Sequence, residues 1–90
     1  MKISKTTINF ASRRNIELII DEGTVSFYPL NDDNGEPAFI YSKQDTGLFF
    51  KANIWLTPET KEELPYWIMN EAMLRRLIDH VKPEFELIEN

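Results

Sequence analysis

Short runs of β-branched and aromatic residues alternate with turn residues over the first two-thirds of the chain, and this alternation limits the fold more than any other feature. The runs cover residues 15–20, 24–28, 38–42 and 48–56. The turns between them are Asp21-Glu22-Gly23, the stretch 31–37 with Asn34-Gly35 at its centre, and Gln44-Asp45-Thr46-Gly47. Asn-Gly accepts positive φ at both positions and is typical of tight hairpins. Consecutive short strands joined by tight turns predict an antiparallel β-meander.

Helix signals replace strand signals after residue 56. Thr57 supplies a hydroxyl for an N-cap, Pro58 fits the first helical position, and Glu59 suits the positive end of the helix dipole. A helix is therefore expected to begin at Pro58.

Two further prolines divide the helical region. Pro65 disfavours helical geometry at the residue before it, so we expect a short helix over about 58–64 and a longer one over about 65–81, ended by Pro83. Apolar side chains of the longer helix share one arc: Tyr66, Trp67, Met69, Met73, Leu74, Leu77, Ile78 and Val81. The expected fold class is α+β, an antiparallel meander of four to five strands with one face covered by this C-terminal helical region.

The two ends of the chain carry weaker signals. Ile8 and Phe10 predict a further edge strand in the opening segment. Glu84-Phe85-Glu86-Leu87-Ile88 alternates in polarity and predicts a last strand or an acidic tail.

Length and composition predict one domain. Ninety residues that are 42% hydrophobic suffice for one core. We expect a single α+β domain over 1–90, mainly β over 1–56, helical over 57–82, with a tail or edge strand over 83–90. The lack of cysteine excludes disulfides, thiolate metal sites and cysteine nucleophiles, and it favours a cytoplasmic protein. Neither a signal peptide nor a membrane span is expected, since apolar residues never run on for long.

The net charge of −5 is unevenly distributed. Residues 1–14 carry four bases and no acid, whereas residues 15–36 carry six acids and no base. Most of this charge is expected to serve solubility. The acidic majority suits a basic protein partner, and the segregation leaves room for a local basic patch.

Each candidate for catalysis or metal binding lacks a feature that its chemistry requires. Asp32-Asp33-Asn34-Gly35-Glu36 contains calcium-type ligands, but placing Gly35 at the sixth position of an EF-hand loop puts Tyr41 at the twelfth. His80 is the only histidine, and we expect it near a helix end, where the dipole favours its charge. Glu59, Glu62, Glu63 and Glu71 are expected on exposed turns or faces. The chain is therefore expected to be no enzyme and to use no metal or cofactor.

Two polar positions of the longer helix have structural explanations. Asn70 falls inside the apolar arc and is expected as a core amide bonded to the sheet edge, or else as a partner contact. Glu71 and Arg75 stand four residues apart and are expected as a surface pair.

The longest predicted strand carries the most informative pattern. With a period of two, one side presents Leu48, Phe50, Ala52, Ile54 and Leu56 and is expected to be core. The other side presents Phe49, Lys51, Asn53, Trp55 and Thr57. Tyr28 and one of Phe39 or Tyr41 join this second side from neighbouring strands if the register allows. These aromatic and polar side chains are expected on the sheet face opposite the helices.

Three explanations remain open for an aromatic ladder on an open sheet. It is covered by the N-terminal segment or the C-terminal tail, it forms a protein interface with a target or a second copy, or it binds single-stranded nucleic acid. In the third case the bases stack on the aromatics while Arg13, Arg14, Lys43 and Lys51 follow the phosphates. The strand-to-helix junction Trp55-Leu56-Thr57-Pro58-Glu59 is similar to that of the transcription-coactivator type of β4α single-strand binders. The basic residues of that family are mostly absent, so no family is assigned.

The expected function is a small, acidic, non-enzymatic protein-interaction module, acting as a stand-alone inhibitor or adaptor. Its expected partner-binding residues are Phe49, Lys51, Asn53, Trp55, Tyr28 and Tyr41. Phage-encoded inhibitors of host machinery are often acidic domains of this size, which is an analogy only. The alternative is a single-stranded nucleic-acid binder that uses the same face.

Overall fold

The described part of the chain forms one antiparallel sheet and three helices. The computed structural model describes residues 1–30 and 35–86. In chain order its elements are α1 (Lys5–Ser12), β1 (Ile16–Ile20), β2 (Thr24–Pro29), β3 (Phe39–Gln44), β4 (Gly47–Asn53), α2 (Pro58–Glu62), β5 (Trp67–Ile68) and α3 (Glu71–Glu86). The five strands stand in the order of the sequence, and every neighbouring pair is antiparallel. The α+β class and the antiparallel meander are confirmed.

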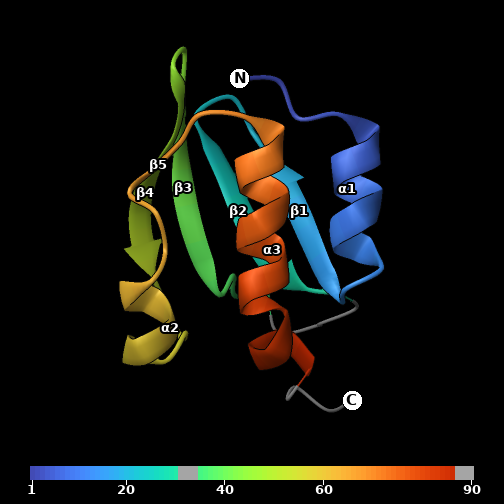
Figure 1. Cartoon of the computed structure of the whole chain (residues 1–90), viewed down its shortest axis with the longest axis vertical. Coiled ribbons are helices and arrows are strands. Elements are labelled where there is room, and N and C mark those ends of the chain that lie inside the picture. The colour runs from blue at the N-terminus through green and yellow to red at the C-terminus, as the bar shows by residue number, and fades with distance from the viewer. Residues whose placement is uncertain (31–34, 87–90) are drawn as a thin grey trace.

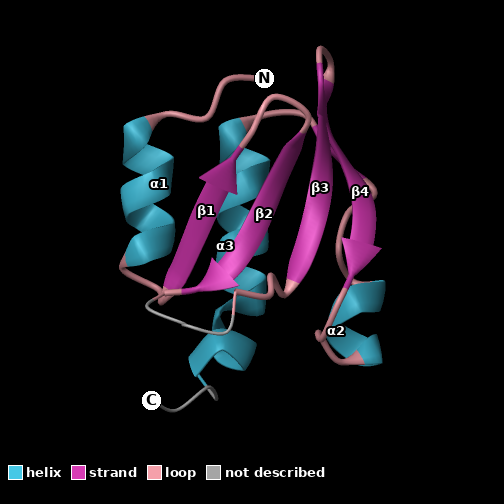
Figure 2. Cartoon of the chain, turned by 180° about the vertical axis from the view of Figure 1, so that it is seen from behind, coloured by secondary structure: helices cyan, strands magenta, loops and turns pink. Residues whose placement is uncertain are grey.

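The molecule has two layers. Helices α1 and α3 lie on one side of the sheet, while α2 lies beyond the end of β4 (Figure 1). Seen from behind, the strands stand in front of α3, while α1 lies beside β1 at the edge of the sheet (Figure 2). We call the covered side the helix face and the other side the open face.

Strand register assigns the core residues to the helix face, because directly paired residues of antiparallel strands point to the same side. Leu18 pairs with Phe27, Phe27 with Phe39, and Val25 with Tyr41. These side chains are buried together with Leu74, Leu77, Ile78, Val81 and Phe85 of α3. The core therefore lies between the sheet and α3, with Ala11 of α1 closing one side.

An irregularity in β4 changes the predicted alternation. Ile40 pairs with Ala52 and Tyr41 with Phe50, so Lys51 is an extra residue between these two pairs. A bulge of this kind reverses the faces of the residues beyond it. Ala52, predicted as core, consequently lies on the open face with Ile40. The prediction that Ile54 is core was wrong as well, since it follows the end of β4 and is 42% exposed.

The opening segment is a helix, and the predicted edge strand through Ile8 and Phe10 was wrong. The Ser4 side chain accepts a hydrogen bond from the Thr7 amide at 3.4 Å and caps the N-terminus of α1. Thr7 and Ala11, one helical turn apart, are buried against the rest of the fold. Burial of this stripe outweighs the β-propensity of the two threonines.

The short helix was predicted correctly, and a longer C-terminal helix follows it as expected, but the predicted bounds of 65–81 for the longer helix were wrong. Thr57 caps α2 and Pro58 begins it, as expected. The region 65–81 instead contains the short strand β5 and most of α3. Asn70 separates them, because its side-chain oxygen accepts a hydrogen bond from the Met73 amide at 2.9 Å. Asn70 is thus an exposed N-cap rather than a core amide.

The helix α3 continues through Pro83 to Glu86, so the predicted stop at Pro83 was wrong. Val81 and Phe85, on either side of this proline, are both buried. Glu84 to Glu86 therefore belong to the helix rather than to a strand or tail, while residues 87–90 lie outside the described part of the chain. Among the described residues, no helix has the length and apolar character needed to cross a membrane.

Candidate functional site

The open face carries side chains of mixed polarity. From β1 to β5 it presents Glu17, Ile19, Tyr28, Ser26, Ile40, Ser42, Phe49, Ala52 and Trp67, as the strand register requires. Small side chains occupy much of the middle, and Ile19 on β1 is 38% exposed. Large aromatic side chains gather at the opposite edge, on β4 and β5.

Three rings form what we call the aromatic cluster: Phe49, Tyr66 and Trp67. Phe49 and Trp67 are paired across β4 and β5, with ring centroids 5.9 Å apart and planes inclined by 7°. Tyr66 meets Phe49 edge-on at 5.8 Å. The Trp67 indole N–H donates to the Thr46 carbonyl at 3.0 Å, which fixes the ring over the β3–β4 turn.

The aromatic cluster belongs to a segment with unusual exposure. Of the five exposed large hydrophobic side chains in the described residues, Tyr66, Trp67 and Met69 lie within four positions of each other. Tyr66 is 70% exposed and Trp67 is 43% exposed. Apolar surface of this kind, concentrated on one edge, is typical of a contact site.

The structure separates the residues that the sequence placed on one ladder. Phe49 and Tyr28 lie on the open face, and Lys51 is exposed at the bulge between Phe49 and Ala52. Asn53 leaves the ladder because the bulge pairs it with Phe39 on the helix face, and Trp55 leaves it because β4 ends at Asn53. The Asn53 side chain accepts from the Leu56 amide at 2.9 Å and donates to the Leu56 carbonyl at 3.1 Å, which closes a turn.

Trp55 and Tyr41 are turned into the fold. The Trp55 ring packs on Phe85 of α3 with centroids 5.4 Å apart, so the C-terminal helix covers it. Tyr41 lies on the helix face and is fully buried, and its hydroxyl donates to the Pro65 carbonyl at 2.6 Å. Burial raises the pKa of the Tyr41 phenol well above its ordinary value, which keeps it a neutral donor.

The four basic residues proposed to follow phosphates do not gather on the open face. Arg14, at the end of α1, forms an ion pair with Asp79 of α3 at 2.7 Å and stacks over the Phe10 ring. Both of its contacts belong to the helix layer. Arg13 is exposed beside it. Lys43 pairs with Leu48 and so belongs to the helix face, while Lys51 lies two positions after Phe49, at the bulge in β4.

A carboxylate on α3 joins the two long helices. Oε1 of Glu71 accepts from the Ser4 amide and hydroxyl at 2.8 Å each and from the Thr7 hydroxyl at 2.6 Å. Hydrogen bonds from Thr7 and then Ser4 lower the pKa of Glu71 below 4.5, so it is ionised at neutral pH. Arg75 donates to the same Thr7 hydroxyl at 3.0 Å. Glu71 and Arg75 were expected as an exposed surface pair, but both bond to Thr7 and so connect α3 to α1.

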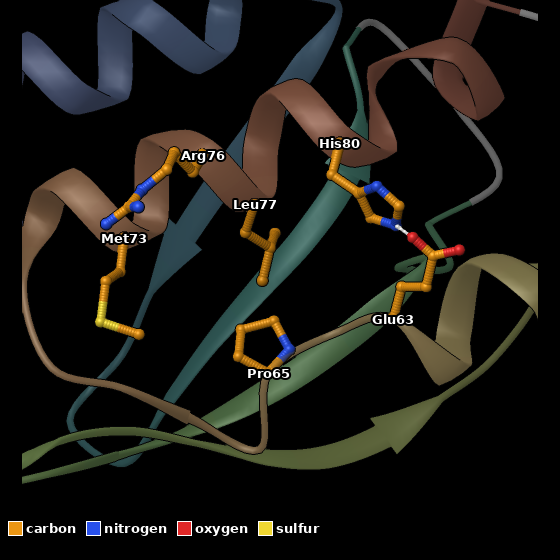
Figure 3. Close-up of a pocket in the computed structure, with 6 residues that line it drawn as sticks. All are labelled: Glu63, Pro65, Met73, Arg76, Leu77 and His80. Carbon is orange, nitrogen blue, oxygen red and sulfur yellow. Dashed lines mark ion pairs between the residues drawn. The ribbon is translucent and has the colours of Figure 1, made fainter.

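The helix layer carries a groove of about 280 Å³ between α3 and the segment after α2. Figure 3 shows Leu77 and Pro65 in its middle, Arg76 and Met73 at one end, and Glu63 with His80 at the other. His80 Nε2 lies 3.8 Å from Glu63 Oε1. His80 stands in the body of α3, since the helix runs on to Glu86, so the expected position near a helix end was wrong.

Sequence reasoning missed Tyr66 and Trp67 as surface residues, because their spacing fits the apolar arc of a helix that continues into α3. A signal was present at the next two positions. Asn70 followed by Glu71 is a capping residue with an acid in the first turn, which marks a helix start after Met69.

In the described residues no group of three or more acidic or histidine side chains is placed to hold a metal ion. Comparison with models of protein families, with curated proteins and with solved structures found no match to the chain.

Proposed function

We propose that the chain is a protein-interaction module that docks onto another protein through the open face of its sheet, as a small inhibitor or adaptor. The aromatic cluster on β4 and β5 carries this proposal. Tyr and Trp side chains with partly exposed rings are the commonest anchors of protein interfaces, because they bury a large area at a small entropic cost.

The rigidity of the aromatic cluster supports its role as an anchor. Trp67 is held by a ring stack on Phe49 and by the hydrogen bond to Thr46, so little side-chain freedom remains to be lost on binding. A partner that covered this edge would also reach Ile40 and Ala52 in the middle of the open face.

Charge supports a partner with a basic surface. The chain carries a net charge of −5. Opposite net charges accelerate encounter and set the orientation of approach, while the apolar contacts determine the lifetime of the complex.

Affinity capture from the native cell extract, followed by reconstitution with the purified partner, tests the proposal. The double variant Tyr66→Ser with Trp67→Ser is expected to lose the partner that the unchanged chain captures. The matched control is Ile54→Ser, which removes an apolar side chain that is exposed to the same degree as Trp67 and lies beyond the end of β4. Thermal melts establish that all variants are folded.

Two results would contradict the proposal. In one, the double variant retains the partner while a variant elsewhere loses it. In the other, sedimentation of the pure chain shows a dimer that Tyr66→Ser with Trp67→Ser dissociates, which would make a second copy the occupant of the open face.

A further inference from the structure

A second surface, on the other layer of the molecule, has the features of a small-ligand site. We propose that the groove between α3 and residues 63–65 binds a small apolar carboxylate, with the anionic group on Arg76 and the hydrocarbon body on Met73, Leu77 and Pro65.

The size and ends of the groove favour a short ligand. Its volume of about 280 Å³ lies just below the ~300–1,000 Å³ that is usual for small-molecule sites. The Glu63–His80 pair stands across one end (Figure 3). An extended peptide needs a groove that is open at both ends, whereas a compact ligand fits a groove that is closed at one end.

The floor of the groove is apolar. Leu77 is 3% exposed and gives the groove a fixed base, while Met73 and Pro65 are half-buried at its sides. A thioether side chain such as Met73 adapts its rotamer to irregular ligands. Hydrocarbon placed on this floor is removed from water, which supplies the attraction.

The charged side chains of the groove determine the orientation of the bound ligand. Within residues 1–30 and 35–86 Arg76 takes part in no ion pair or side-chain hydrogen bond, whereas Arg14, Arg75 and Lys82 are each engaged. The planar guanidinium fits a carboxylate with two parallel hydrogen bonds. At the other end Glu63 repels an anion, so the carboxylate is expected at the Arg76 end.

The methyl groups of the methionines report ligand binding by NMR. The chain has three, Met1, Met69 and Met73, and methyl-labelled protein gives one NMR signal for each. Titration with phenylbutyrate is expected to shift the Met73 methyl signal in a saturable manner and to leave Met1 unmoved. The neutral amide of the same acid is expected to bind more weakly, since it lacks the charge that Arg76 recognises.

Charge variants test the assignment of Arg76. Arg76→Gln is expected to weaken phenylbutyrate binding roughly two- to fivefold, the range for a partly exposed ion pair. Arg76→Lys is expected to retain part of the affinity. Arg13→Gln is the matched control, because it removes an exposed cation from the end of α1, outside the groove.

Three results would overturn the proposal: no saturable Met73 shift at millimolar phenylbutyrate, equal affinity for the acid and its amide, or unchanged affinity in Arg76→Gln. A short peptide ending in leucine that binds more tightly than the free acid would assign the groove to a protein terminus instead. The outcome is independent of the proposed function, since Tyr66 and Trp67 are not among the groove's lining residues.

Discussion

Glu71 shows how one side chain can fasten two distant parts of a chain. Its carboxylate oxygen takes hydrogen bonds from Ser4 and Thr7, which are more than sixty positions away in sequence. Glu71→Gln keeps the shape but removes the charge that strengthens these bonds. Because the site is partly exposed, we expect a loss of about 1 kcal/mol in the free energy of unfolding near pH 7.

The same contact gives the stability a defined pH dependence. Folding lowers the pKa of Glu71 below the 4.5 that it approaches in the unfolded chain. The contribution is therefore complete above about pH 4.5 and is lost as the pH falls through the lowered folded-state pKa. The free energies of unfolding of the unchanged chain and of Glu71→Gln, measured by urea titration, are expected to differ near pH 7 and to converge once the pH falls below the lowered folded-state pKa of Glu71. Glu17→Gln, on the open face, is the matched charge control, and an equal effect there would contradict the assignment.

Among the elements, the pairing of β4 with β5 depends on one glycine. Gly47 has φ of 139°, a conformation that favours glycine, and a Cβ there would meet the Ile68 carbonyl oxygen and the Trp67 indole nitrogen, the latter at 2.8 Å. Gly47→Ala is expected to destabilise the chain by about 2 kcal/mol, which lowers the melting temperature by roughly 10 °C. Gly23→Ala, with open space around its position, is the control and is expected to change stability by less than about 1 kcal/mol.

The elements also show what sequence patterns can and cannot predict. Local signals sufficed where one residue type decides the geometry, as at Thr57-Pro58 of α2 and at the Asp21-Gly23 and Gln44-Gly47 turns. Periodicity predicted the wrong elements where apolar residues of two elements share one helical spacing. Trp67 of β5 and Met73 of α3 were therefore assigned to a single helix. Periodicity failed again at Lys51, because one extra residue in β4 reverses the faces after it and no local signal marks that position.

These two failures explain why only part of the predicted binding surface lies on the open face. The open face itself follows from an amphipathic helix on a meander, and Phe49 lies on it as predicted. Asn53, Trp55 and Tyr41 do not lie on the open face. The bulge at Lys51 moves Asn53, the turn at Leu56 removes Trp55, and the strand register places Tyr41 on the helix face. A simple alternation of two residues predicts none of these. The aromatic cluster replaces part of the ladder with side chains from a strand that the pattern had assigned to a helix.

At the scale of the whole molecule, folding separates the aromatic residues from most of the basic ones. Arg13 and Arg14 follow the C-terminal end of α1, in the helix layer, and Arg14 is neutralised by Asp79. The open face combines Phe49 and Trp67 of the aromatic cluster with Glu17, and Lys51 is exposed at the bulge in β4. A binder of single strands requires a cationic track beside its stacking rings, since released counterions supply most of the affinity.

This separation predicts weak association with nucleic acid. A fluorescently labelled oligothymidine of about twenty nucleotides, mixed with the chain at roughly 50 mM salt, is expected to show no rise in anisotropy below about 100 µM protein. The Lys51→Glu variant is then expected to give the same anisotropy as the unchanged chain. Binding that falls steeply with added salt and disappears in Lys51→Glu would contradict this expectation, because it would show that one lysine beside stacked rings is enough to hold a strand. Stability in that variant must match the unchanged chain, which the exposed position of Lys51 on the bulge leads us to expect.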